Sequence, residues 1–241
     1  MGDLINVRIP DTIIGLGAID SLGNVAETFE PNKILIVTDK GLVKAGIIDA
    51  VKKPLENSGL EFNVFDRCEE EPPPSIVEEL AQLIKTEGFD LLIGVGGGSS
   101  MDTTKAASVI ALTGMSMREY MKVPFHDKIE GRIVRKILVP TTSGTGSEWS
   151  IVTPIYDKKN DGRANVVHAW ENLPDKVIID PELSLRLPQG ITADTGMDAL
   201  AHAIEAYTSC AANVISDMLA STAIKLISEN RSINQLIFRI D

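Results

Sequence analysis

A glycine-rich turn in the first half of the chain has the residue types of an anion-binding site. It follows an apolar run, 90–93, that predicts a buried strand, and it precedes an amphipathic segment, 101–112, that predicts a helix. Glycines let the backbone approach a ligand, and the free N–H groups and dipole of a helix N-terminus favour negative charge. We therefore expect the pyrophosphate of a nucleotide to bind here. The candidate residues are Gly96, Gly97, Gly98 and Ser99.

The spacing of this turn departs from the usual dinucleotide fingerprint. In a G-x-G-x-x-G motif that starts at Gly94, the third glycine would fall on Ser99. The turn alone therefore indicates a phosphate, without fixing which nucleotide carries it.

A second polar turn, residues 141–148, follows another apolar run, 137–140. Its hydroxyl groups and glycines suit ribose and phosphate oxygens, although a flexible Ser/Gly loop has the same composition. Its place directly after a core strand favours a functional loop. The candidate cofactor contacts are Thr141, Thr142, Thr145 and Ser147.

Asp39 ends the apolar run that begins at Lys33. A carboxylate in this position can bind a ribose 2′-hydroxyl and repels a 2′-phosphate, so it favours NAD over NADP if a dinucleotide binds. The alternative is a polar loop residue that follows a strand and contacts no ligand.

Asp198 and His202 are four residues apart in a segment with helical periodicity. That spacing places both side chains on one helix face. A carboxylate and an imidazole so placed can share a divalent cation. Two residues alone favour the alternative, a hydrogen-bonded pair near the start of a helix.

Strand-like and helix-like segments alternate as far as about residue 187, which predicts an α/β fold with a parallel sheet and ligands at the carboxyl ends of its strands. Ser75 and Glu78 predict a capping box on a helix that Gly88 ends. From Ile191 to Asn230 the pattern is continuously helical. We expect an α/β domain over residues 1–187 and a helical region over residues 188–241.

The net charge of −11 argues against a nucleic-acid or anionic-membrane partner. Cys68 and Cys210 form no metal-type cluster, so they predict free thiols in a reducing compartment. The three glutamates after Cys68 should disfavour its thiolate. The sequence has no apolar run near the roughly 20 residues that span a bilayer and no segment typical of a signal peptide, so we expect a cytoplasmic protein.

Three motifs together resemble the iron-containing (group III) alcohol dehydrogenase family: residues 96–105, 141–148 and 196–205. The resemblance covers essentially residues 5–230. It implies a Rossmann-like nucleotide-binding domain followed by the start of an all-helical domain. It also implies hydride transfer between NAD(P) and a small alcohol or aldehyde, at a divalent Fe²⁺ or Zn²⁺ that polarises the substrate oxygen.

The resemblance assigns roles to individual residues. Asp102 and Lys105 belong to the motif around the phosphate turn, and we count Asp102 among the cofactor-binding residues. Asp198 and His202 correspond to the first two of four metal ligands. The positions that match cofactor contacts are Asp39, Gly97, Gly98, Ser99, Thr141, Thr142, Thr145 and Ser147.

The chain departs from the family in its last part. The family has two further histidine ligands downstream, whereas this chain ends at Asp241, and His126 and His168 match neither position. The tail, 231–241, fits no expected continuation, which predicts a frameshift or a truncation. We therefore expect weak metal binding, and apolar helix faces that are exposed or buried in a homo-oligomer.

Three functions remain open at this point. The chain is an alcohol dehydrogenase impaired by truncation, a non-catalytic NAD(P)-binding remnant of one, or a metal-free reductase related to the maleylacetate reductases. Retention of Asp198 and His202 argues against the third.

Overall fold

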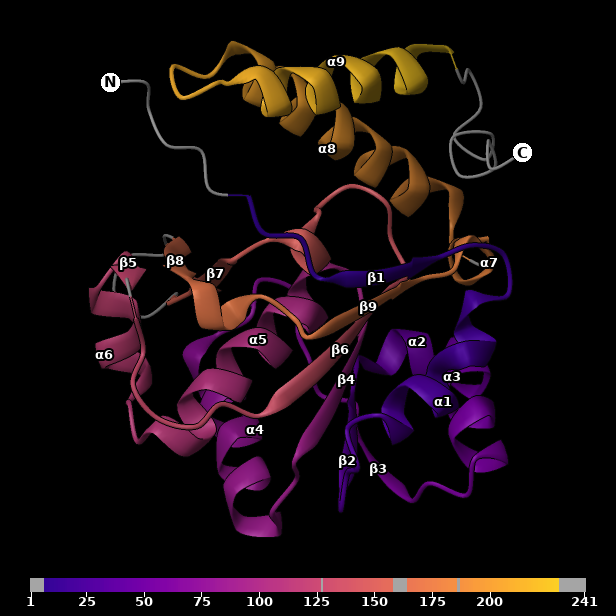
Figure 1. Cartoon of the computed structure of the whole chain (residues 1–241), viewed down its shortest axis with the longest axis vertical. Helices are drawn as coiled ribbons and strands as arrows, with labels where there is room; N and C mark the ends of the chain where they lie inside the picture. Colours follow the sequence, from indigo (N-terminus) through magenta and orange to yellow (C-terminus); the bar gives the residue numbers. More distant parts are fainter. Residues whose placement is uncertain (1–6, 127, 158–163, 186, 230–241) are drawn as a thin grey trace.

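The computed structural model describes residues 7–126, 128–157, 164–185 and 187–229. Its centre is a six-stranded sheet in which every neighbouring pair is parallel (Figure 1). In spatial order the strands are β1 (Asp11–Ile14), β9 (Lys176–Ile179), β6 (Arg135–Pro140), β4 (Leu91–Gly96), β2 (Ile34–Val37) and β3 (Phe62–Phe65). The predicted α/β fold with a parallel sheet is confirmed.

Helices cover both faces of this sheet (Figure 1). Leu35, Val37 and Leu92 pack toward α4 and α5, while Ile36 and Ile93 pack on the opposite face toward α1 and α3. The neighbouring strands β2 and β4 are buried along their whole length, as expected for apolar runs covered on both sides. The helices are α1 (Leu22–Glu27), α2 (Lys40–Lys44), α3 (Ile47–Asn57), α4 (Pro74–Glu87), α5 (Gly98–Thr113), α6 (Met117–Lys122) and α7 (Pro181–Ser184).

Two local predictions are wrong. The capping box of Ser75 and Glu78 is not formed, because α4 already begins at Pro74 and its cap position, Pro73, has no side-chain acceptor. Proline is favoured in the first turn of a helix and takes that place here. Gly88 does end α4, in the left-handed conformation with φ 74°. Helix α5 begins at Gly98, three residues before the predicted start.

A smaller sheet lies beside α5 and was not predicted. Its order is β5 (Phe125–His126), β8 (Ala164–Ala169), β7 (Val152–Tyr156), with an antiparallel β7–β8 pair. Strand β5 precedes β6 in the chain, whereas β7 and β8 follow a 3₁₀ turn at Ser147–Trp149 that ends the loop after β6.

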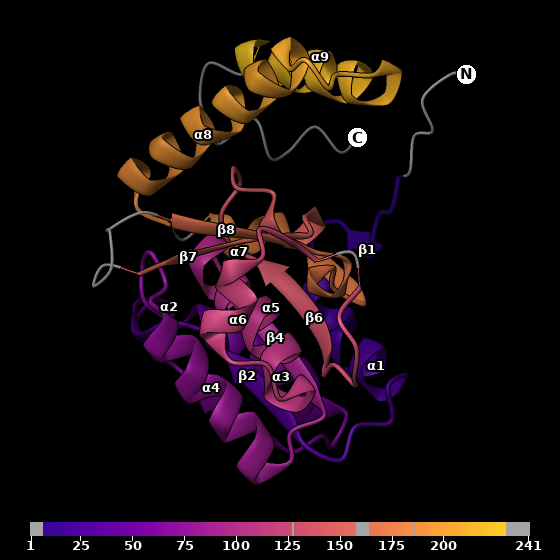
Figure 2. The ribbon, with the colours of Figure 1, turned by 90° about the vertical axis from the view of Figure 1, so that its left-hand side faces the viewer.

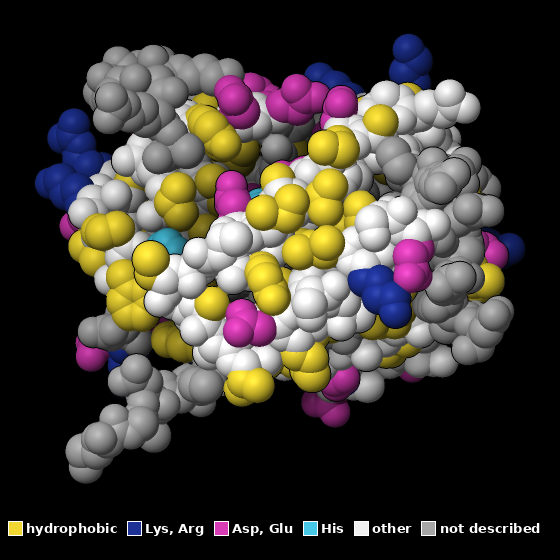
Figure 3. Space-filling model, turned by 90° about the horizontal axis from the view of Figure 1, so that it is seen from above, with side chains coloured by type: hydrophobic (Ala, Val, Ile, Leu, Met, Phe, Trp, Pro, Cys, Tyr) yellow, Lys and Arg dark blue, Asp and Glu magenta, His cyan; other side chains and the backbone are white. Residues whose placement is uncertain are grey.

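The helical segment from residue 191 onward divides into α8 (Gln189–Thr208) and α9 (Val214–Glu229), which pack on each other in a separate layer above the sheet (Figure 2). Among their described residues only Ala203 and Ala220 are buried. Large apolar side chains are exposed on this layer. Figure 3 views the molecule from above Figure 1, from the side of α8 and α9, and shows apolar groups gathered on that face. They include Met197, Tyr207, Val214, Met218 and Leu219. The tail at 231–241 lies outside the described residues.

Candidate functional site

The order of the strands creates a crevice at one edge of the sheet. The chain runs from β2 to its neighbour β3, and then crosses to β4 on the other side of β2. Helices after β2 and β4 therefore leave the sheet on opposite faces, and such a switch point is where open α/β sheets bind ligands. Asp39 follows β2 and Gly97 follows β4, so both predicted residues lie at this point.

The N-terminus of α5 faces this crevice with free amide groups. Gly97 precedes the helix in an extended conformation and provides no side-chain cap. The first bond of the helix runs from the N–H of Met101 to the carbonyl of Gly97. Within the described part of the chain, the N–H groups of Gly98, Ser99 and Ser100 donate to no acceptor. Three free donors and the positive end of a 16-residue helix suit an anion.

Two glycines of the turn have no room for a side chain. A Cβ on Gly98 would lie 2.9 Å from Cγ2 of Thr145, and Gly96 has φ 146° with Ser100 2.8 Å from its Cβ position. The turn therefore needs glycine at these positions because of close approach and backbone conformation. The contact of Gly98 with Thr145 also brings the two predicted turns together.

A cavity of about 640 Å³, which we call the Asp39 cavity, lies on one side of the α5 N-terminus. The carboxylate of Asp39 accepts from the N–H of Leu42 at 3.0 Å, so it caps α2. The hydroxyls of Thr141 and Thr142 are buried and have no hydrogen-bond partner within the described residues. Buried polar atoms are normally paired, so these two indicate a missing ligand or water.

A second cavity of about 640 Å³, the His202 cavity, lies on the other side of the turn. Asp102, Thr145 and Ser147 line one wall of it, and Asp198 and His202 line the other. Gly98 and Ser99 line both cavities. The free N-terminus of α5 therefore stands between two spaces of similar size, an arrangement suited to a molecule with a central anionic group.

Asp102 and Ser147 contact each other at the wall of the His202 cavity. The Ser147 hydroxyl donates to Oδ1 of Asp102 at 2.6 Å, and Nζ of Lys105 donates to the same oxygen at 2.9 Å. Burial lowers the pKa of the Lys105 ammonium, and the charge of Asp102 opposes that shift. Burial raises the pKa of the neighbouring Glu148 carboxyl.

Asp198 and His202 lie on one face of α8, as their spacing predicts. Nε2 of His202 is 3.8 Å from Oδ1 of Asp198, and both side chains are about half exposed. Nδ1 of His202 is 3.2 Å from the carbonyl oxygen of Gly144. Since a carbonyl only accepts, Nδ1 must carry the proton in that bond, which leaves Nε2 of the neutral ring as a potential ligand.

The two donors are of the right types for a divalent cation, but too few. Catalytic metal sites use about three protein ligands and one open position. In the described ranges, no group of three His, Cys, Asp or Glu side chains could hold a metal ion. His126 stacks on Tyr120 and His168 lies near Phe125, so neither histidine joins the site.

Several contacts of the cleft were not foreseen from the sequence. Leu187, Pro188 and Ile191, from the segment that joins the two predicted regions, line the Asp39 cavity. Cys68 also lines it, and burial is the main cause that raises the pKa of this thiol to about 12. The acids that add to the shift are Asp39 and Asp66, rather than the three glutamates that follow Cys68. Both Cys68 and Cys210 are free thiols.

The chain is similar in sequence and fold to known proteins. Models of the iron-containing alcohol dehydrogenase family match residues 10–181 and, for its C-terminal region, residues 192–236. The long-chain-alcohol dehydrogenase 1 of Geobacillus thermodenitrificans is 40% identical over 92% of this chain and 55% of its own length. A solved 1,3-propanediol oxidoreductase has a TM-score of 0.88 and 32% identity, covering 98% of this chain and 60% of that one.

A third relative was solved with a cofactor. The sulfoacetaldehyde reductase from Bifidobacterium kashiwanohense in complex with NAD⁺ is 28% identical with a TM-score of 0.84, covering 98% of this chain and 65% of that one. The chain belongs to the iron-containing alcohol dehydrogenase family, whose members are NAD-dependent oxidoreductases of alcohols and aldehydes. It spans 55% to 65% of the length of these three proteins. The described residues include no helix long and apolar enough to cross a membrane.

Proposed function

We propose that the chain binds NAD in this cleft and transfers a hydride reversibly between NAD and a small alcohol or aldehyde. The single observation that carries the proposal is the pair of cavities that share Gly98 and Ser99. A dinucleotide has an anionic pyrophosphate between two nucleosides. The free amides of α5 can bind the pyrophosphate, and the cavities on either side of them are each large enough for one nucleoside.

The residues around the turn give the orientation. The pyrophosphate binds the amides of residues 98–100, and the adenosine half lies in the Asp39 cavity. The buried hydroxyls of Thr141 and Thr142 then find acceptors or donors on the cofactor. The nicotinamide half lies in the His202 cavity, between Thr145 and α8.

Charge favours NAD over NADP. Asp39, Glu69 and Glu70 all line the Asp39 cavity, and a 2′-phosphate would meet these carboxylates. Asp39→Asn removes one of them and is expected to narrow the preference for NADH over NADPH at least tenfold in fluorescence titrations. Glu56→Gln, a loss of the same charge on α3 outside the cavity, is the matched control. An unchanged preference in Asp39→Asn would mean that Asp39 does not face the ribose.

A divalent metal is the second part of the proposal. When bound, Fe²⁺ or Zn²⁺ polarises the oxygen of the substrate. Asp198 and His202 supply two ligands, fewer than the about three protein ligands of a catalytic metal site, so we expect weak binding by this chain. The division into a nucleotide-binding domain, 1–187, and a metal-binding helical region, 188–241, belongs to the same proposal.

The test measures binding and turnover separately. NADH affinity is determined by fluorescence titration, and short alcohols and aldehydes are then assayed with Fe²⁺, with Zn²⁺ and with a chelator. Metal-dependent turnover supports the dehydrogenase. Binding without turnover rejects catalysis by this chain and supports a non-catalytic NAD-binding protein, a candidate favoured by the presence of only two described metal donors. Turnover that persists in the chelator supports a metal-free reductase. No NADH binding rejects the whole proposal.

Two further features of the protein are part of the proposal. The exposed apolar side chains of α8 and α9 support a homo-oligomer. The two free thiols support a reducing compartment, and we expect the cytoplasm.

A further inference from the structure

Lys105 is a buried cation that contacts neither cavity. It is fully buried in the second turn of α5, and it lines neither the Asp39 cavity nor the His202 cavity. Its ammonium nevertheless lies within hydrogen-bond distance of four oxygens, which share its three N–H donors: Oδ1 of Asp102 at 2.9 Å, Oγ and the carbonyl of Ser147 at 3.0 and 3.1 Å, and the carbonyl of Val152.

These partners come from three separate segments. Asp102 belongs to the first turns of α5, Ser147 ends the second polar turn, and Val152 begins β7. A buried ammonium is costly to desolvate, and it persists where its donors are satisfied and a counter-charge is near. All the oxygens that satisfy Lys105 therefore have to remain in place together. The ammonium fixes the polar turn at 141–147 relative to the N-terminal turns of α5.

The position of the second turn determines the cleft. Thr145, two residues before Ser147, packs on Gly98, and Ser147 N donates to the Thr145 hydroxyl at 3.3 Å. Gly144, one residue further back, accepts from His202. A displacement of Ser147 would therefore move the wall of the His202 cavity and the contact of that wall with α8.

We propose that Lys105 is a positioning residue that holds the 141–147 turn against the N-terminus of α5 and so keeps the two cavities joined around one dinucleotide. The inference rests on the proposed binding of NAD for its functional consequence. Its structural part, the tie between the turn and α5, does not depend on any ligand.

Lys136 offers a matched control. It is also fully buried, its ammonium donates to the carbonyl of Glu171 at 2.8 Å, and it lines neither cavity. Lys105→Met and Lys136→Met each remove one buried ammonium and replace it with an unbranched apolar side chain of similar length. Any general effect of removing a buried ammonium is present in both variants, so a difference between them reports on the particular contacts of Lys105.

The experiment measures NADH affinity and amide hydrogen exchange on the full chain, with thermal unfolding as the measure of stability. We expect Lys105→Met to raise the Kd for NADH at least tenfold, about 1.4 kcal/mol, and to accelerate exchange across 145–152 while exchange in β2 and β4 stays unchanged. Lys136→Met is expected to lower the melting temperature but to leave the Kd within twofold and the exchange of 145–152 unchanged.

Two results would overturn the proposal: equal weakening of NADH binding in both variants, or unchanged exchange of 145–152 in Lys105→Met. If the wild-type chain fails to bind NADH, the proposed function fails, and the exchange comparison still decides whether Lys105 positions the turn. If Lys105→Met does not fold, Lys105→Gln, which keeps a donor, replaces it and is expected to show a smaller change in the same two readouts.

Discussion

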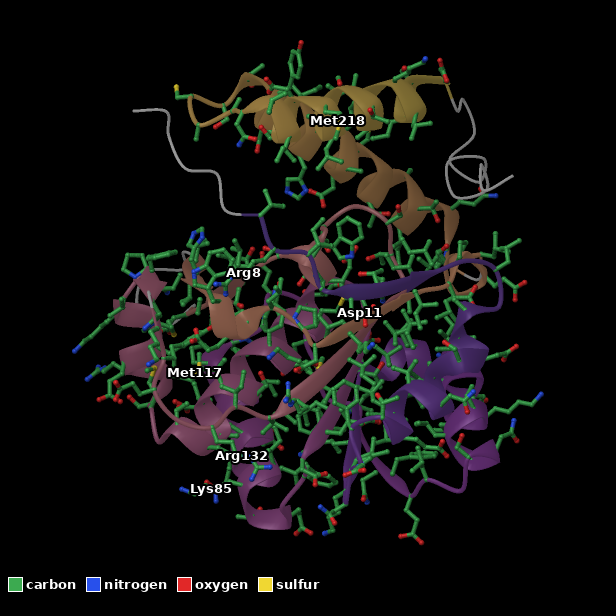
Figure 4. The ribbon with its side chains drawn as sticks, viewed as in Figure 1. Arg8, Asp11, Lys85, Met117, Arg132 and Met218 are labelled. Atoms are coloured by element: carbon green, nitrogen blue, oxygen red, sulfur yellow. The ribbon has the colours of Figure 1, made fainter. Side chains whose placement is uncertain are left out.

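The α/β part of the molecule and the α8–α9 pair bury their apolar side chains very differently. In the α/β part, two clusters of buried residues occupy the two faces of the main sheet, and Leu92 and Ile93 on β4 are fully buried on opposite faces. In α8 and α9, the buried side chains of the described residues are those of two alanines. Met218, labelled on α9 in Figure 4, is 59% exposed.

This difference in apolar burial implies that the two regions contribute unequally to the stability of the fold. The α/β part buries an extensive apolar core, whereas the helix pair contributes little apolar burial of its own. The candidate cleft lies where these regions meet, with the nucleotide turns on the stable side and Asp198 and His202 on the other. We therefore expect nucleotide binding to tolerate changes in the helix pair better than metal binding does.

The largest expected effect tests the contrast directly. Leu92→Ala removes a fully buried side chain from β4 and should lower the free energy of unfolding by about 2–5 kcal/mol. Leu219→Ala, the same substitution on α9 at a side chain that is 55% exposed, should change it by less than about 0.5 kcal/mol. Urea unfolding of both variants measures the two values. A cost above about 2 kcal/mol at Leu219 would show that another surface covers α9.

A smaller effect is expected where the two regions touch. A Cβ on Gly144 would lie 2.3 Å from the carbonyl oxygen of Thr195 on α8, so Gly144→Ala must push the turn and the helix apart. Overpacking of this kind costs about 1–3 kcal/mol. We expect hydrogen exchange of α8 to accelerate while exchange in β2 and β4 is unchanged.

Gly190→Ala is the control for this substitution, because Gly190 lies in the first turn of α8 and nothing lies within 4 Å of its Cβ position. It should leave the exchange of α8 as in the wild type. If Gly144→Ala also leaves it unchanged, the contact of the turn with α8 does not hold the helix pair in place.

The central part of the fold was predictable because its signals are local. Apolar runs at β2 and β4, and the glycines at 96–98, determine strand, turn and helix without reference to distant residues. The i,i+4 spacing of Asp198 and His202 likewise determines that they share a helix face. The start of α5 is an exception, because the helix begins at Gly98, three residues before the amphipathic segment.

The unpredicted features depend on contacts between distant segments. Strand β7 alternates buried and half-buried residues and pairs with β8. No pattern in the local sequence indicates that these two segments pair. Asp102 is three residues from Lys105, but its other two partner residues, Ser147 and Val152, are 42 and 47 residues away, so the local motif does not show what the ammonium holds. The site residues Asp39, Thr141, Thr142 and Ser147 line the cleft, while their contact with a cofactor stays a prediction.

Alkaline pH offers a smaller test of the same contrast, because the fully buried lysines of the described chain lie in the α/β part. Burial lowers the pKa of the Lys136 ammonium from 10.5 to about 8. Below pH 8 the Lys136 ammonium is charged in both the folded and the unfolded chain, and the desolvation of this charge destabilises the folded chain. Between pH 8 and 10.5 the unfolded state binds a proton that the folded state does not, so stability rises with pH.

The measurement compares wild type with Lys136→Met, in which the titrations of all other groups cancel. From pH 7 to pH 9, the free energy of unfolding of the wild type should rise by about 1 kcal/mol relative to the variant. A difference that stays constant with pH would mean that the Lys136 ammonium remains protonated over this range.

The smallest effect on stability is expected on the exposed face of α9, together with a change in assembly. If this face is buried between copies of the chain, Met218→Glu with Leu219→Glu places two charges in an apolar interface and should shift the oligomer to monomer in sedimentation velocity. The free energy of unfolding of the α/β part should change by less than about 0.5 kcal/mol, because both side chains are exposed in the single chain.

Met218→Leu, which keeps the apolar face, should leave the assembly unchanged. A wild-type chain that sediments as a monomer would contradict the predicted homo-oligomer, and an oligomer that persists in the double variant would place the interface on another surface.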